Sequence, residues 1–157
     1  MKIRFLTIAL FFVVAHLFAD DKTNGKTELG KQQTNVTLLS LNGTFSGSGS
    51  DSTGPGQMTW ILTQTNTTVR GTVTAKTQLG TVAFKGTIYG TISNTTLNFA
   101  IVIPKGGISD LPNCTSDILG SATGVTNTSI RGTYTGNCSC TGSFQNGKFT
   151  LAKQNTP

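Results

Sequence analysis

The segment YGTISNTTLNFA, residues 89–100, contains the pattern that decides the fold. On both sides of Asn94-Thr95, apolar residues or glycine alternate with polar residues, a spacing that is typical of β-strands with one buried face. If Asn94-Thr95 forms a two-residue turn, the returning strand places Leu97 opposite Ile92. One face of this hairpin is then apolar and the other largely polar, as in an antiparallel sheet that covers a core.

Two further segments repeat this arrangement, TQTNTTVRGTVT around Asn66 and TGVTNTSIRGTY around Asn127. The three Asn-Thr turns are about thirty residues apart, with one hairpin in each repeat. From Leu38 onward Thr, Ser, Gly and Val dominate, and no apolar spacing of three or four residues indicates a helix. The pattern predicts strands at residues 39–47, 57–65, 68–76, 81–93, 96–104, 116–126, 129–145 and 148–153. The dipeptide Asn146-Gly147 predicts the turn between the last two strands.

An even number of consecutive antiparallel strands with one apolar face predicts an all-β, eight-stranded up-and-down barrel. A β-sandwich is the alternative architecture. In a barrel the three Asn-Thr turns lie together at one end, the tight end. The opposite end, the wide end, receives the longer connections 47–57, 76–80 and 105–114 and the Asn146-Gly147 turn. Loops on a rigid scaffold often carry recognition, so the wide end is the expected functional end, unless these loops merely connect strands.

The tripeptide Gly43-Thr44-Phe45, on the first predicted strand, is similar to the Gly-x-Trp that opens many lipocalin-like and avidin-like barrels, with Phe in place of Trp. Over residues 39–153 the chain therefore resembles small exported bacterial barrels of this calycin-type architecture. The resemblance implies a barrel and a general habit of binding, and it transfers no ligand residues. The chain has a single Trp, whereas avidins line their biotin site with several.

The first residues have the organisation of a secretory signal peptide. Met1–Arg4 is basic, Phe5–Phe18 is apolar, and Ala19 precedes the expected cleavage point. The apolar run is too short for a hydrocarbon core that needs about 20 residues, so we do not expect an integral membrane protein. We predict a signal peptide at 1–19, a flexible polar leader at 20–37 and a single barrel domain at 38–154. The expected location is the periplasm or the extracellular space.

The predicted mature chain lacks histidine, because His16 lies in the signal peptide. This removes the commonest general base and the commonest zinc ligand. Asp110 and Asp117 are weak candidates for a glycosidase pair, since their setting indicates solvated surface charges. Asp51 alone makes a poor calcium site. We therefore expect no enzymatic activity, no metal and no cofactor.

The balance of charge argues against nucleic acid as a partner. Twelve Lys and Arg residues oppose six Asp and Glu residues, and two of the cations, Lys2 and Arg4, lie in the predicted signal peptide. The remaining cations are spread thinly along the chain and form no cluster, whereas nucleic-acid binding domains carry a basic patch or stripe.

Cys114, Cys138 and Cys140 belong to a chain that we expect to be exported, which makes disulfide bonding the default. A hairpin centred on Asn127-Thr128 places residue 114 opposite residue 141, within the error of the register. This predicts one disulfide, from Cys114 to either Cys140 or Cys138, and one remaining thiol. A link between Cys138 and Cys140 rarely satisfies disulfide geometry.

Two functions remain open. The first is a non-catalytic barrel that binds a small apolar or amphipathic ligand, with candidate ligand-binding residues Trp60, Ile88, Phe99, Ile101 and Tyr134. Four glycines are predicted to face the interior: Gly71, Gly86, Gly90 and Gly132. They either leave space for a narrow cavity that opens toward the 47–57 and 105–114 loops, or they admit large aromatic rings that fill the barrel. The second function is an extracytoplasmic protein–protein interaction module, such as an inhibitor of a secreted enzyme or a surface interaction domain, acting through the wide-end loops.

Overall fold

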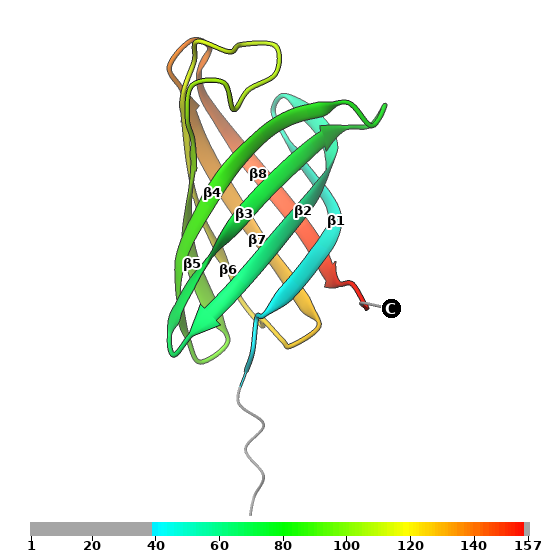
Figure 1. Cartoon of the computed structure of the whole chain (residues 1–157), viewed down its shortest axis with the longest axis vertical. Helices are drawn as coiled ribbons and strands as arrows, with labels where there is room; N and C mark the ends of the chain where they lie inside the picture. Colours follow the sequence, from blue (N-terminus) through cyan, green and yellow to red (C-terminus); the bar gives the residue numbers. More distant parts are fainter. Residues whose placement is uncertain (1–38, 156–157) are drawn as a thin grey trace, which may run out of the picture. The chain divides into compact units, whose positions relative to one another are not determined.

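The computed structural model describes residues 39–155, which form a closed antiparallel barrel (Figure 1). The strands are β1 (Gly43–Asp51), β2 (Gly54–Thr65), β3 (Thr68–Thr77), β4 (Val82–Ser93), β5 (Thr96–Ile103), β6 (Ser116–Ala122), β7 (Ser129–Cys138) and β8 (Gly142–Lys153). Each strand pairs with its neighbours in sequence, and β1 pairs with β8 to close the sheet. The prediction of an eight-stranded up-and-down barrel is confirmed over the β-sandwich. The predicted signal peptide and leader lie outside the described residues.

The predicted turns at Asn66 and Asn94 are confirmed. Both residues have a positive φ, 54° and 53°, a conformation that Asn tolerates better than most residues do. Because a two-residue turn fixes the register, Ile92 faces Leu97 as predicted, and Trp60 faces Val73. The five candidate ligand-binding residues of the prediction are all buried. Among residues 39–155 no helix is long and apolar enough to cross a membrane.

The third predicted turn, at Asn127-Thr128, is wrong. β6 ends at Ala122 and β7 begins at Ser129, so the connection is longer than two residues. The β6–β7 ladder is therefore displaced by one residue, and Ser116 pairs with Cys138. Asn127 has another role, because its side-chain oxygen accepts a hydrogen bond of 2.7 Å from the backbone N–H of Ser40. This hydrogen bond holds the segment that precedes β1 against the tight end of the barrel.

The predicted turn at Asn146-Gly147 is also wrong. The chain reverses at residues 139–141, between β7 and β8. Asn146 has a φ of 59° but lies inside β8, where the register with β7 shifts, so the dipeptide forms a β-bulge. Gly147 has no side chain, and the ring of Tyr134 packs directly over it.

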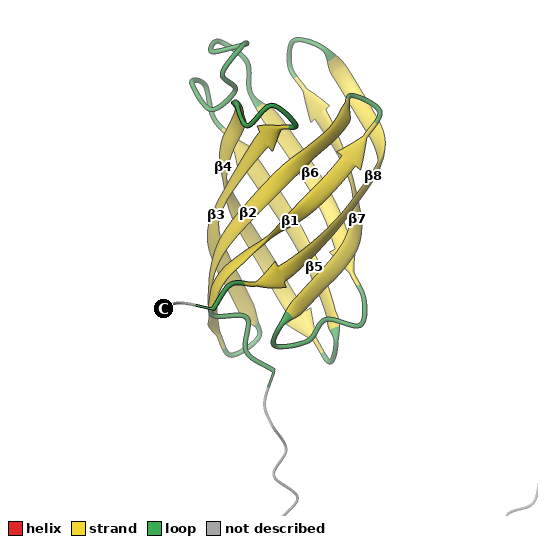
Figure 2. Ribbon diagram, turned by 90° about the vertical axis from the view of Figure 1, so that its right-hand side faces the viewer, coloured by secondary structure: helices red, strands yellow, loops and turns green. Residues whose placement is uncertain are grey.

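Segments outside the barrel strands lie at the tight end, which is the lower end in Figure 2. Residues 39–42 precede β1 rather than forming its start, which corrects the predicted strand 39–47. Leu41 is fully buried, and its backbone N–H donates a 2.9 Å hydrogen bond to the side chain of Gln64. Val125, from the β6–β7 connection, is buried in the same core.

Aromatic rings fill the middle of the barrel. The ring centroids of Trp60, Phe99 and Phe149 lie 4.9–5.7 Å from one another. The ring of Phe99 covers Gly120, where an added Cβ would lie only 2.3 Å from it. Gly120 therefore admits a ring at this level rather than leaving space. It is not one of the four glycines of the prediction, at each of which an added Cβ would first meet a backbone oxygen of a neighbouring strand. The buried indole N–H of Trp60 has no hydrogen-bond partner among the described residues.

Candidate functional site: a cavity at the wide end

Open space occurs where the strands reach the wide end, the upper end in Figure 1. Two adjoining lobes have volumes of about 180 and 170 Å³, and Asp51, Phe84 and Tyr134 border both. The first lobe lies against the β1–β2 hairpin and the end of β3. The second lobe is largely apolar, with a lining that includes Ile103, Ile108, Leu111, Ile118, Phe144 and Cys138. The first lobe lies beside the 47–57 connection, and the second lies beside both loops toward which a cavity was predicted to open, 47–57 and 105–114.

The apolar lobe depends on how the β5–β6 loop, residues 104–115, folds back. The β4–β5 ladder ends at Thr87, and beyond it the loop lies beside β4 in the place of β5. The backbone N–H of Lys85 donates to the carbonyl of Gly107 at 2.8 Å, and Phe84 forms an isolated bridge with Ile108. This pairing sets Ile108 and Leu111 against the lumen, where both border the cavity.

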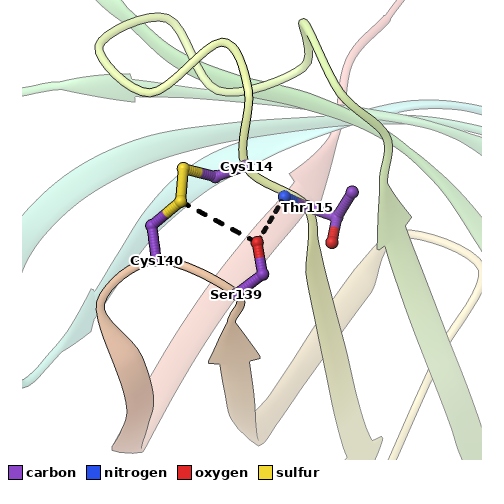
Figure 3. The surroundings of a disulfide bond; sticks show 4 residues. All are labelled: Cys114, Thr115, Ser139 and Cys140. Atoms are coloured by element: carbon purple, nitrogen blue, oxygen red, sulfur yellow. Dashed lines mark hydrogen bonds between the residues drawn. A yellow bond between two sulfur atoms is a disulfide. The ribbon is translucent and has the colours of Figure 1, made fainter.

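A disulfide between Cys114 and Cys140 braces this loop (Figure 3). It joins the end of the loop to the β7–β8 turn, and two hydrogen bonds between Thr115 and Ser139 run beside it, at 3.0 and 2.9 Å. This is the first of the two pairings that the sequence allowed. The one-residue shift of the β6–β7 ladder explains the choice, because it places residue 140 rather than 141 level with residue 114.

Cys138 remains as a buried thiol that borders the apolar lobe. The hydroxyl of Thr141 and the backbone N–H groups of Cys140 and Thr141 lower the pKa of the Cys138 thiol, and they outweigh the opposite effect of burial. The tight β7–β8 turn creates this environment, because it directs backbone donors toward the last residue of β7.

The polar centre of the cavity is a hydrogen bond of 2.8 Å from the Tyr134 hydroxyl to Oδ2 of Asp51. Asp51 ends β1, and its other oxygen accepts hydrogen bonds from the backbone N–H and the hydroxyl of Thr53. Tyr134 reaches it from β7 by crossing β8 over Gly147, where no side chain obstructs the ring. Burial raises the pKa of Tyr134, and the neighbouring carboxylate raises it further. The phenol therefore stays protonated and acts as a donor.

Of the five candidate ligand-binding residues from the sequence, Tyr134 borders the cavity. Trp60, Ile88, Phe99 and Ile101 are buried in the core and border neither lobe. Sequence reasoning assigned no binding role to Phe84, Ile108 or Leu111. The available signal was the presence of two apolar residues, Ile108 and Leu111, in an otherwise polar loop.

The carboxylates also divide into those that border the cavity and those that do not. Asp110 and Asp117 are exposed and border neither lobe, and Asp51 is the carboxylate that reaches the cavity. Within the described part of the chain, no group of three or more His, Cys, Asp or Glu residues lies close enough to hold a metal ion. Asp51 is therefore a single anionic group beside an apolar lobe, with hydrogen bonds that hold it in place.

Comparison with known proteins supports the architecture. No protein-family model matches the chain, and no curated protein matches it. The fold is similar to a solved structure described as EF1p2_mFAP2b bound to DFHBI, with a TM-score of 0.50 and 17% sequence identity, covering 73% of this chain and 94% of that one. The likeness supports a barrel, and membership of the lipocalin-like or avidin-like proteins stays a prediction.

Proposed function

We propose that this chain is an exported, non-catalytic barrel that binds a small apolar or amphipathic molecule in the wide-end cavity. The observation that carries the proposal is the largely apolar lobe of about 170 Å³ in a barrel whose lower and middle parts are filled. Each lobe is smaller than the roughly 300 Å³ at which ligand pockets usually begin, so the ligand is slim or occupies both lobes.

Three further observations support the proposal. The similar structure described above was solved bound to a small molecule, DFHBI. The signal-peptide pattern of residues 1–19 and the disulfide both favour export, because disulfides persist in oxidising compartments. The cavity offers one carboxylate, a phenol held protonated and the Cys138 thiol, and the single histidine of the chain, His16, lies in the predicted signal peptide. Such a site suits binding better than proton-transfer chemistry.

A filled lobe tests the proposal. Ile118 borders the apolar lobe, and Ile118→Phe adds volume there, whereas Ile61→Phe makes the same change on the exposed outer face of β2. The probe is prodan, a slim neutral dye whose emission shifts when it leaves water. We expect saturable binding to the wild-type protein, affinity at least about tenfold lower for Ile118→Phe because one lobe is lost, and unchanged affinity for Ile61→Phe.

Absence of saturable binding by the wild-type protein overturns the proposal and favours an interaction module that acts through the wide-end loops. Equal affinity of the wild-type protein and Ile118→Phe also overturns it, because the dye then binds elsewhere. Near-ultraviolet circular dichroism, which reports on the environment of Trp60, establishes that both variants keep the packed core.

A further inference from the structure

Asp51 lies where the two lobes of the cavity meet, at the end of β1. It is half-buried, and among residues 39–155 its hydrogen-bond partners are Thr53 and Tyr134, neither of which is a cation. A carboxylate has about four acceptor positions. Two of them, on Oδ1, serve Thr53 and one on Oδ2 serves Tyr134, so Oδ2 retains a free position.

Among the described residues, the one Lys or Arg that borders the cavity points away from this carboxylate. Lys76 borders the first lobe, but it pairs with Gln57 on β2, and both residues are exposed. Their neighbours Ala75 and Met58 are buried and face the lumen, so alternation along the strands places Lys76 on the outer face. A partly desolvated carboxylate attracts a cation more strongly than one in water does.

Tyr134 completes an arrangement suited to several donors. Its proton is committed to Oδ2 of Asp51, which leaves the lone pairs of the phenol oxygen available as acceptors. A primary ammonium carries three N–H donors and can use both the free position on Asp51 and the phenol oxygen. A hydroxyl head group offers one donor, and a carboxylate head group offers none and is repelled by Asp51.

From this arrangement we infer that the ligand is a cationic amphiphile of the alkylammonium type, with its head group at Asp51 and Tyr134 and its chain in the apolar lobe. The inference rests on the proposed function and names the chemical class of its ligand. Ile108 and Leu111, from the loop that the disulfide braces, line the lobe that would hold the alkyl chain of the ligand. The hydrogen bonds from Thr53 hold the carboxylate in place before a ligand arrives, which lowers the entropic cost of binding.

Three eight-carbon compounds that differ only in the head group test this inference: octylamine, octanol and octanoate. Isothermal titration calorimetry at neutral pH is expected to give octylamine an affinity about tenfold higher than that of octanol, since a charge-assisted hydrogen bond contributes more than a neutral one. Octanoate is expected to bind most weakly. Asp51→Asn should abolish the preference for the amine, so that octylamine and octanol bind with similar affinities. Asp117→Asn removes the same charge from the exposed face of β6 and should keep the preference.

The possible failures are distinguishable. Octanol binding as tightly as octylamine, or octanoate binding most tightly, overturns the head-group assignment while the proposed function stands. A preference for octylamine that persists in Asp51→Asn removes Asp51 from the site. If none of the three compounds binds although prodan does, the inference fails and the proposed function stands. If prodan does not bind either, both fail. Should Asp51→Asn not fold, the ranking of the three compounds by the wild-type protein still decides.

Discussion

At the tight end, two segments outside the strands contribute Leu41 and Val125 to the buried core, and the barrel is filled there. At the wide end, the β5–β6 loop contributes Ile108 and Leu111 to the walls of a cavity. The same eight strands run through both halves. The difference shows that the connecting segments decide whether the lumen of this small barrel is filled, because eight strands alone lie at the size where either outcome is possible.

The same substitution in each half gives the sharpest test of this comparison. Leu97 is fully buried on β5, and Leu111 is half-buried beside the cavity. Leu97→Ala should lower the free energy of unfolding by about 2–5 kcal/mol, because it leaves a void among packed side chains. Leu111→Ala should cost less than about 1 kcal/mol, because it only enlarges space that is already open. Urea denaturation followed by Trp60 fluorescence measures both.

Equal losses for the two variants would mean that the wide end is packed as densely as the tight end. The cavity described above would then be closed by side-chain movement in solution, and the comparison between the halves would fail. An unchanged dependence of the unfolding free energy on urea concentration establishes that neither variant alters the folded or the unfolded state more broadly.

The disulfide gives a second difference between the two halves, because it braces the wide end alone. Cys114 and Cys140 are 26 residues apart in sequence, and a bridge across a loop of this size contributes about 3 kcal/mol. Replacing both by Ser should lower the free energy of unfolding by that amount. Amide hydrogen exchange should accelerate first in residues 104–115, while the hydrogen bond between Leu41 and Gln64 at the other end stays protected.

Cys138→Ser serves as the control for this experiment, because it changes a cysteine and leaves the bridge intact. Its exchange pattern should match that of the wild-type protein. Loss of protection spread evenly over both ends in the double variant would contradict the assignment of the disulfide to the wide-end loop as a local brace.

The hairpins could be predicted because their determinants are local. A two-residue turn at Asn66 or Asn94 fixes the register, and alternation then decides which residues are buried. The same reasoning failed at Asn146-Gly147, because a turn and a bulge both require a positive φ. The choice between them depends on a distant residue, since the ring of Tyr134 packs over Gly147. No local pattern contains that contact.

The site was harder to predict than the fold. Alternation identifies the residues that face the interior. It does not show at which level along the barrel axis the packed core gives way to a cavity, so Trp60 and Phe99 were as plausible as Tyr134 as ligand-binding residues. The cavity depends on the β5–β6 loop, whose place beside β4 is set by long-range hydrogen bonds and by the disulfide. The place of Asp51 in the cavity depends on its hydrogen bond with Tyr134, which lies two strands away on β7 and is not apparent from the local sequence.

The smallest expected effect concerns Tyr134 itself. Tyr134→Phe removes the hydrogen bond to the Asp51 carboxylate, which should cost about 1.5 kcal/mol at neutral pH. The wild-type protein should also lose stability at alkaline pH in a way that the variant does not. Because the pKa of Tyr134 is raised in the folded protein, the stabilisation is fully present below the unfolded value of about 10 and is lost as pH rises through the folded value.

Urea denaturation from about pH 7 to about pH 11 measures this dependence, with both proteins in a Cys138→Ser background to prevent thiol exchange with the disulfide. The difference in stability between tyrosine and phenylalanine should stay constant up to about pH 9 and shrink above about pH 10, since the unfolded chain then releases the phenol proton and the folded chain does not. A difference in stability that stays constant over the whole pH range would mean that Tyr134 is not shielded from water. The wide end would then be more open than the structure shows.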